Sequence, residues 1–419
     1  MRAWASVEVP DLNLVPAQIS VFDSASQQLQ NLRIADEVTM YVCGITPYDA
    51  THMGHASTYV AFDTLLRVWQ AAGAGVNYTQ NVTDVDDPLI ERAKLLSRNW
   101  QELAIEQTEL FKSDMVALRV IPPANYIGAV ESISLVEQQV LKLQENNCVY
   151  EVSGDLYYEI GKSKVAGKIA HLSRDQMIEI FSQRGGDPAR VGKHDPLDAL
   201  LWKLEQPDDP SWASVLGKGR PGWHIECAAI AIEYLGETID VQGGGSDLKF
   251  PHHEMSAAHA QSSTGKPFAR NFLHTGMVSL DGEKMSKSLG NLVFVSKLIH
   301  SGVDPMAIRL NILSHHYRAD WEWFDKDLRD AVERLSLWRD AFACESGTAD
   351  QSQEIFNFLV NDLDTPSAID AIDSWASRTL ISQKDYAQHE DSQDNAAQAL
   401  DPDSPESMQR TVDALLGIV

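Results

Sequence analysis

Apolar positions in the first 120 residues fall into short continuous runs and longer segments of helical spacing. Residues 38–43 form a buried, mostly apolar run that ends at Gly44 and predicts a strand, and residues 76–80 are interpreted as a second strand. Between them, residues 56–72 carry apolar side chains at helical spacing and stop at Gly73. The three segments predict a βαβ unit. Two further helices are expected at 88–97 and 100–119, before a proline pair at 122–123.

The rest of the chain shows the same alternation after an interruption. A helix is expected at 129–145 and a hairpin at 149–160, whereas residues 161–222 are rich in Gly, Pro and Asp and predict an irregular insertion. A helix at 223–234, a strand at 238–242, a helix at 251–263 and a strand at 272–277 follow. Beyond residue 304 the pattern is helical, with Pro402 and Pro405 marking a loop.

These elements predict an α/β fold built on a doubly wound parallel sheet, which is Rossmann-like and binds ligands at the carboxyl ends of its strands. We expect a connective insertion and a C-terminal helical bundle in addition. The predicted parts are an arm at 1–35, catalytic halves at 36–120 and 222–291, the insertion at 121–221, a linking helical region at 292–330, and a helical domain at 331–419.

Composition narrows the class of protein. The chain has 419 residues, 44% hydrophobic and 22% charged, which is typical of globular proteins. It contains no apolar run of the ~20 residues that a membrane span needs, and its first residues lack a signal-peptide pattern, so a cytoplasmic protein is expected. Its four cysteines are widely scattered, which favours metal ligands or nucleophiles over disulfides.

The charge balance argues against a nucleic-acid partner. The net charge is −26, and residues 345–419 carry 15 acidic side chains against three basic ones, a net of −12. A polyanionic backbone gains little from such a surface.

Two short motifs far apart predict ATP chemistry at the α-phosphate. His52-Met53-Gly54-His55 lies where the first strand leads into a helix, and Lys284-Met285-Ser286-Lys287-Ser288 follows a later strand. Imidazoles at a helix N-terminus and two lysines on a loop can stabilise a pentacovalent phosphorus and a departing pyrophosphate. We assign His52 and His55 to the phosphates, and Lys284 and Lys287 to closure over the pyrophosphate, with Mg²⁺ accompanying ATP. Taken singly, the histidines could be a capping or core pair and the lysines a solvated turn.

Longer blocks of sequence resemble the cysteine-activating branch of the class I aminoacyl-tRNA synthetases. These blocks are residues 41–55, 81–87, 222–227 and 243–254. Within that branch the chain is similar to the cysteine ligases of mycothiol biosynthesis, in residues 46–52, 183–188, 256–260 and 411–417. Gln183 departs from that family, which usually has Glu before Arg-Gly-Gly-Asp-Pro, so this chain has an amide where the family usually has a carboxylate.

The resemblance implies a zinc ion held by Cys43, Cys227 and His252. Zinc with an open position binds a thiolate far better than a hydroxyl, which would select cysteine over serine. Cysteinyl-tRNA synthetases commonly have a Glu ligand four residues after the histidine, but that place is Ser256 here. Glu254 would point off another side of a helix and is a poor substitute. Without the resemblance, a cysteine at the end of a buried strand is usually a small core residue.

The resemblance also implies a pocket for cysteinyl-adenylate. Its expected lining residues are Cys43, Gly44, Ile45, Thr46, Thr58, Asn81, Val82, Thr83, Trp223, Gly245, Ser246, Asp247 and Val278. Asp247 can hold an ammonium group, and Trp223 would form a flat wall beside the thiolate. The glycine run at 243–245 could instead be a turn, and Trp223 a core residue. Asp84, Asp86 and Asp87 are interpreted as helix-capping residues.

The activity implied is that of an AMP-forming ligase. It would activate L-cysteine with ATP and transfer it to the amine of glucosaminyl-inositol (GlcN-Ins), acting as a monomer without nucleic acid or membrane. One alternative is a cysteinyl-tRNA synthetase that lacks a full anticodon-binding domain. Another is a synthetase-like nucleotide sensor without activity. The base for the amine attack and the residues around the inositol ring stay open.

Overall fold

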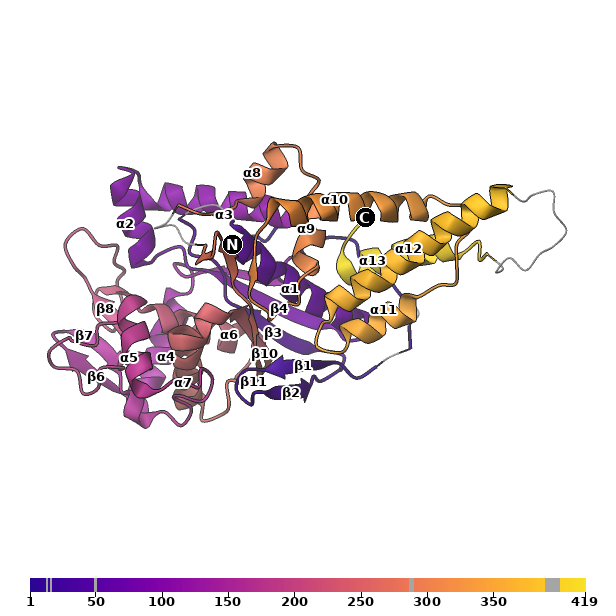
Figure 1. Ribbon diagram of the computed structural model, residues 1–419. Helices are drawn as coiled ribbons and strands as arrows, with labels where there is room; N and C mark the ends of the chain where they lie inside the picture. Colours follow the sequence, from indigo (N-terminus) through magenta and orange to yellow (C-terminus); the bar gives the residue numbers. More distant parts are fainter. Residues whose placement is uncertain (13, 16, 49–50, 286–289, 389–399) are drawn as a thin grey trace.

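A computed structural model describes residues 1–12, 14–15, 17–48, 51–285, 290–388 and 400–419. At its centre lies a five-stranded parallel sheet in the order β11-β10-β3-β4-β5 (Figure 1). Its strands are β3 (Val38–Val42), β4 (Val76–Val82), β5 (Asn125–Gly128), β10 (Ile239–Gly245) and β11 (Ala269–Thr275). The chain adds strands to one side of β3 and later to the other, which confirms the doubly wound sheet. In such sheets the ligand crevice lies at the switch point, here between β3 and β10.

The first crossover helix, α1 (Met53–Ala71), connects β3 to β4 as the apolar pattern predicts. His52 caps its start, because the imidazole Nδ1 accepts a hydrogen bond from the Gly54 amide at 3.1 Å. The helix ends at Ala71 with Ala72 as its C-cap, and the following Gly73 adopts φ +86°, a conformation that glycine reaches without strain.

Alternation along β3 determines which side chain faces which layer. Met40 and Val42 join the apolar core that surrounds α1, whereas Tyr41 and Cys43 join a second core on the opposite face. Successive side chains of a strand point to opposite faces, so Cys43 is directed toward that second core. This second core includes Cys227 of the helix α6 (Trp223–Leu235).

The insertion is more regular than the sequence predicted. Instead of an irregular 161–222 segment, the structure has a helix α5 (Arg174–Gln183) and strands β8 (Ala199–Leu204) and β9 (Gly219–Pro221). With the predicted hairpin, β6 (Val149–Val152) and β7 (Asp155–Tyr158), they form an antiparallel sheet in the order β6-β7-β8-β9. β8 pairs with a strand 40 residues earlier, a contact that local periodicity does not encode.

The structure differs from the sequence analysis in two other places. Strand β5 was not predicted, because its four residues after the proline pair are too few to show a period and are held by pairing with β4. The glycine run at 243–245 belongs to strand β10 and is not a turn. A Cβ at Gly243 would lie 2.3 Å from the ring of Phe62, so glycine lets α1 pack directly on the sheet.

Helices follow the second half of the sheet. Figure 1 shows the helices from residue 325 onward extending to the right of the sheet, on the side away from the insertion, whereas the short helix at 295–300 lies above the sheet. α13 (Ser404–Leu416) returns to pack against α1. The other helices of this region are α8 (Val295–His300), α9 (Pro305–Leu313), α10 (Asp325–Phe342), α11 (Ser352–Leu359) and α12 (Thr365–Gln388).

A small three-stranded sheet carries the lysine motif. Its strands are β12 (Val278–Leu280), β13 (Glu283–Lys284) and β14 (Trp321–Glu322). Lys284 therefore lies on β13, whereas Lys287 lies outside the described residues.

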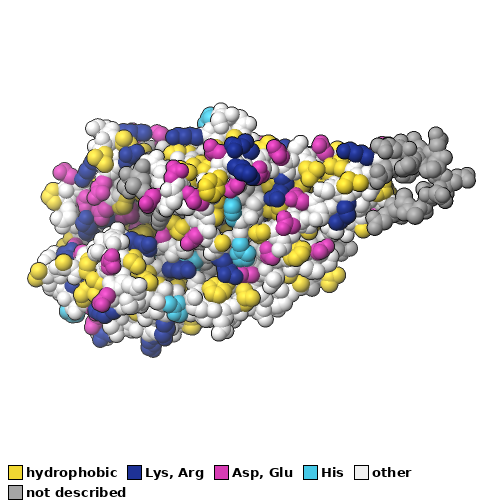
Figure 2. All heavy atoms as spheres, viewed as in Figure 1, with side chains coloured by type: hydrophobic (Ala, Val, Ile, Leu, Met, Phe, Trp, Pro, Cys, Tyr) yellow, Lys and Arg dark blue, Asp and Glu magenta, His cyan; other side chains and the backbone are white. Residues whose placement is uncertain are grey.

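The remaining elements connect these layers. They are β1 (Ser20–Asp23), β2 (Gln28–Asn31), α2 (Asp87–Leu95), α3 (Trp100–Ala117), α4 (Ile133–Glu145), η1 (Ile160–Lys162), η2 (Ser246–Leu248), η3 (Lys249–His253) and α7 (Glu254–Thr264). Acidic and basic side chains are interspersed over the face shown in Figure 2. Among the described residues, none of the helices is both long and apolar enough to span a bilayer.

Candidate active site

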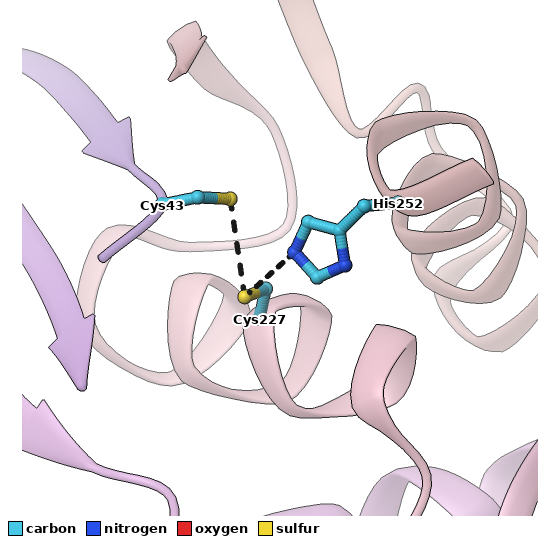
Figure 3. A group of neighbouring side chains, drawn as sticks. All are labelled: Cys43, Cys227 and His252. Atoms are coloured by element: carbon cyan, nitrogen blue, oxygen red, sulfur yellow. Dashed lines mark hydrogen bonds between the residues drawn. The ribbon is translucent and has the colours of Figure 1, made fainter. Parts of the chain in front are cut away.

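Two cysteines and a histidine converge at the carboxyl end of β3. Cys43 follows β3, Cys227 lies in the second turn of α6, and His252 lies in η3 (Figure 3). The Cys43 and Cys227 Sγ atoms are 3.9 Å apart, and His252 Nε2 is 3.1 Å from Cys227 Sγ. All three side chains are buried, and their donor atoms lie within 4.8 Å of one another. Among the described residues, this is the one group of three or more such donors that could hold a metal ion.

The spacing suits a small tetrahedral ion. Thiolate sulfur and imidazole nitrogen bind zinc at about 2.3 and 2.0 Å, which places neighbouring ligand atoms about 3.5 to 3.8 Å apart. The measured separations of 3.9 and 3.1 Å lie on either side of that range. The donor set and its geometry therefore fit a zinc-type site.

Ser256 and Glu254, the two residues considered as a fourth metal ligand, form hydrogen bonds to other groups. The Ser256 hydroxyl donates to the carbonyl of His224 at 2.9 Å. The Glu254 carboxylate accepts from the backbone amides of Lys168, Ile169 and Ala170. Glu254 therefore anchors the insertion, and the metal group has three protein donors among the residues that the structure describes.

A second layer of imidazoles surrounds this group, and no sequence pattern predicted it. His224 Nδ1 lies 3.1 Å from His252 Nδ1, which directs the Nε2 atom of His252 toward Cys227. His253 Nε2 lies 3.2 Å from Cys43 Sγ, and its Nδ1 lies 2.8 Å from His274 Nε2. Partners of this kind orient metal ligands and tune their basicity.

Burial sets the protonation of these groups. It lowers the pKa of His224, His253 and His274 well below the usual range, so all three are neutral imidazoles. Burial also raises the pKa of the Cys43 thiol. Burial acts in the same direction on Cys227, but the hydrogen bond from Cys43 and the His252 imidazole outweigh it and lower that pKa. The pair thus favours a thiolate at Cys227.

A cavity of about 830 Å³ opens beside the metal group. It is lined by most of the residues expected around an adenylate, namely Cys43, Gly44, Ile45, Thr46, His52, His55, Thr58, Trp223, Gly245, Asp247 and Val278. Asn81, Val82 and Thr83 are buried in the layer behind this wall. Ser246 begins η2 between two lining residues. Trp223 stacks on His252, with ring centroids 4.4 Å apart, so it serves as a wall of the cavity and not only as core.

The two histidines of the first motif face the cavity together. Their rings stack with centroids 3.9 Å apart at the start of α1. The capping interpretation of His52 is confirmed, and the same side chain also lines the cavity. The 19-residue helix α1 points the positive end of its dipole at this wall of the cavity, so the wall suits a negatively charged phosphate chain.

Asn81 ties the ends of β3 and β4 together behind the pocket. Its Oδ1 accepts from the Gly44 amide at 2.8 Å, and its Nδ2 donates to the Thr83 hydroxyl at 3.1 Å. A Cβ at Gly44 would lie 1.6 Å from the Asn81 carbonyl oxygen, so only glycine allows the two strands to approach this closely.

We expect Gly44→Ala to lower the free energy of unfolding by about 1 to 3 kcal/mol and to impair cysteine-dependent ATP–pyrophosphate exchange, because β3 and β4 must separate. Urea unfolding and the exchange assay measure the two effects. Gly161→Ala is the matched control, because a Cβ there meets no atom within 4 Å. Equal behaviour of the two variants would contradict this account.

The cavity continues past the start of α2 into the insertion. For the three aspartates before and at the start of α2, the sequence had suggested only capping roles. Asp86 does cap α2, since its carboxylate accepts from the Asp87 amide at 2.8 Å. Asp84 instead accepts from the Val130 amide, and Asp87 forms an ion pair with Arg220. Asp86 and Asp87 also line the cavity, together with Gln183 of the departing motif. Arg184 donates to the carbonyls of Asp247 and Phe250, which joins the insertion to the nucleotide side.

Comparison with known families gives a consistent result. Residues 29–333 match the family model described as the class I tRNA synthetase (C) catalytic domain. The structure is similar to that of Mycobacterium tuberculosis methionyl-tRNA synthetase in complex with methionyl-adenylate, with a TM-score of 0.62, 14% identity, and coverage of 91% of this chain and 90% of the other. At that identity the likeness establishes the fold alone.

Several curated proteins are similar over their whole length. The chain is 50% identical to a protein of Thermomonospora curvata and 51% identical to one of Catenulispora acidiphila, with all of each chain covered. It is also 51% identical to a Kribbella flavida protein, again over the full length of both. All three are named L-cysteine:1D-myo-inositol 2-amino-2-deoxy-alpha-D-glucopyranoside ligase.

Proposed function

Because the chain belongs to the class I tRNA synthetase (C) catalytic-domain family, and within it to the full-length ligases described above, we propose that it is an AMP-forming ligase that joins L-cysteine to the amine of GlcN-Ins. The observation that carries this function is a buried group of two cysteines and one histidine, to which the described part of the chain adds no fourth ligand. It lies beside a cavity that opens on a histidine-flanked helix N-terminus.

The first step requires an acyl phosphate anhydride to form. The carboxylate of cysteine attacks the α-phosphorus of ATP, the bond to the β-phosphate oxygen breaks, and pyrophosphate leaves with the electron pair. His52 and His55 at the start of α1 would hydrogen-bond the phosphate oxygens as negative charge builds up on them. We assign Lys284 and Lys287 to the departing pyrophosphate, and Mg²⁺ to the bound ATP.

Selection of cysteine over serine depends on the side chain of the substrate amino acid. A zinc ion held by Cys43, Cys227 and His252 supplies a preference for a thiolate over the hydroxyl of serine. Trp223, which stacks on His252, forms a wall of the cavity next to the expected position of the thiolate. Asp247 lines the cavity at the nucleotide end and would bind the substrate ammonium, so the amino acid is held at its two ends.

Attack by the sugar amine on the acyl carbon then releases AMP. The names of the full-length relatives support a small amino sugar as the acceptor. The net charge of −12 over residues 345–419 supports the same choice over tRNA. We therefore propose a protein that acts without nucleic acid, and as a monomer in the cytoplasm. A cysteinyl-tRNA synthetase is the competing function.

The acceptor assay tests this choice. With ATP and cysteine present, we expect GlcN-Ins to increase the rate of AMP release at least about tenfold, because it traps the activated acyl group, and tRNA to leave the rate unchanged. Serine in place of cysteine should support little ATP–pyrophosphate exchange. AMP release stimulated by tRNA alone would overturn the proposal. Absence of cysteine-dependent exchange would indicate a nucleotide-binding protein without this activity.

A further inference from the structure

One end of the cavity has no assigned substrate, because L-cysteine and ATP are assigned to the other end. This end, named here the polar arm, is formed by the start of α2, the antiparallel sheet and the loop after α5. Its charged lining residues include Asp86, Asp87, Asp155, Asp187, Arg190 and Lys203. The amino acid, the phosphates and the nucleotide are accounted for at the other end, so the polar arm has room for a second substrate.

The polar arm is joined to the metal group by a short stretch of chain. Arg220 of β9 forms an ion pair with Asp87, and three residues later Trp223 stacks on His252. Asp86 follows β4, the strand that pairs with β3 next to Cys43. Asp86, Gly222 and Trp223 line the same cavity. A substrate in the polar arm would therefore meet the activated cysteine at the level of Asp86.

The charges of the polar arm suit an uncharged polyol. Arg190 lies 2.7 Å from Asp155 and 3.7 Å from Asp187, and Lys203 lies 3.5 Å from Asp87. Each of these five side chains has a partner of opposite sign, so this part of the arm presents ordered donors and acceptors without a large net charge. The Asp87 and Asp187 side chains are still 55% and 38% exposed and have acceptor capacity left for hydroxyl groups. A nucleic-acid end would need an excess of cations here.

Asp86 differs from these paired groups. Burial raises its pKa to about 6, so it is ionised at neutral pH yet accepts a proton more readily than an ordinary aspartate. The charged or titratable groups that face it are Asp87 on α2, Arg220 on β9, Glu226 on α6 and His252 on η3. A carboxylate in this position can bind an ammonium group and take up its proton.

We propose that the polar arm is the acceptor subsite, in which Asp86 binds the amine of GlcN-Ins while Asp87, Asp187, Arg190 and Lys203 hydrogen-bond the hydroxyls of its two rings. This inference rests on the proposed function. In the transfer step the amine nitrogen forms a bond to the acyl carbon, the bond from that carbon to the phosphate oxygen breaks, and AMP leaves with the electron pair. Because the amine binds as an ammonium group, its nitrogen loses two protons, one before and one after the attack, and each passes to the Asp86 carboxylate and then to water.

The test compares binding of GlcN-Ins with binding of its N-acetylated form, which has the same hydroxyls but no basic amine. Isothermal titration should show that the wild type prefers the amine by at least about tenfold, as expected for a hydrogen bond to a charged group. Asp86→Asn should lose this preference. Asn and Ser are both good helix N-caps, so Asp86→Asn and Asp86→Ser should both preserve α2. Asp187→Asn should weaken binding of both compounds about tenfold and keep the preference for the amine.

Asp175→Asn is the matched control, because Asp175 is exposed in the first turn of α5 of the same insertion. It should bind both compounds as the wild type does. In parallel, the ratio of acceptor-dependent AMP release to cysteine-dependent exchange should fall about 100-fold in Asp86→Asn. A wild-type preference in Asp86→Asn and Asp86→Ser would overturn the role of Asp86, and unchanged binding in Asp187→Asn would overturn the subsite. A wild type that activates cysteine but does not use GlcN-Ins would instead refute the proposed function itself.

Discussion

Replacing Cys227 with alanine is expected to remove the bound metal and to lower cysteine-dependent ATP–pyrophosphate exchange by about a thousandfold, which corresponds to several kcal/mol of lost interaction. Cys227 lies between the other two donors, 3.9 Å from Cys43 and 3.1 Å from His252, and it is the thiol with the lowered pKa. Without it, two donors are left, which is too few for a stable zinc site. Elemental analysis and the exchange assay measure the two losses.

Cys148→Ala provides the control. Cys148 is also buried, but its Sγ donates to the carbonyl of Asn146 and takes no part in the metal group. This variant should retain one metal ion per chain and the preference for cysteine over serine. Full activity of Cys227→Ala protein that contains no metal would refute the ligand assignment.

Asp63→Asn is expected to lower the free energy of unfolding by about 3 to 5 kcal/mol, because it leaves two buried arginines without their counter-ion. Asp63 lies in α1 with no exposed side-chain surface, forms ion pairs with Arg67 and Arg309, and accepts from the Ile121 amide. The same arginines donate to carbonyls near the end of α13, namely those of Asp413, Ala414 and Leu416. The carboxylate thus holds together the sheet layer and the last helix. Urea unfolding measures the change.

The pH dependence of this contribution has a definite sign. Burial alone would raise the pKa of the Asp63 carboxyl, but Arg67 and Arg309 outweigh burial and hold the pKa below its usual range. A carboxyl with a lowered folded-state pKa stabilises fully above its unfolded value of about 3.9 and loses this effect as the pH falls through the folded value. The difference between wild type and Asp63→Asn should therefore be constant from about pH 8 to 5 and shrink only below about pH 4.

Asp330→Asn is the control for charge removal, since Asp330 pairs with Lys326 on the exposed face of α10. Its cost should stay within about 1 kcal/mol, the usual range of a surface ion pair. A similarly small cost for Asp63→Asn would show that the buried cluster does not hold α13 to the sheet.

Much of the site could be predicted because it depends on patterns that are local in the chain. The βαβ unit with His52 and His55 at its crossover follows from apolar runs and helical spacing, and the structure places both imidazoles on the cavity. The three metal donors came from a resemblance in sequence, and spacing alone would not have found them. His253 and His274 could not be found in this way, because their partners are distant in the chain. His253 contacts Cys43 across 210 positions, and His274 hydrogen-bonds His253 and Ser24 across 21 and 250 positions.

The sequence by itself determined the elements that depend on near neighbours, which are four of the five strands of the central sheet with the helices between them, and the helix start that faces the cavity; its resemblance to a known family supplied the kind of donors at the metal site. Only the tertiary structure decided which of these come together. Cys43 and Cys227 meet across 184 positions, β7 pairs with β8 across an intervening helix, and Asp63 joins Arg309 of α9. Periodicity records the face on which a side chain lies, whereas its partner is selected by packing of the whole chain.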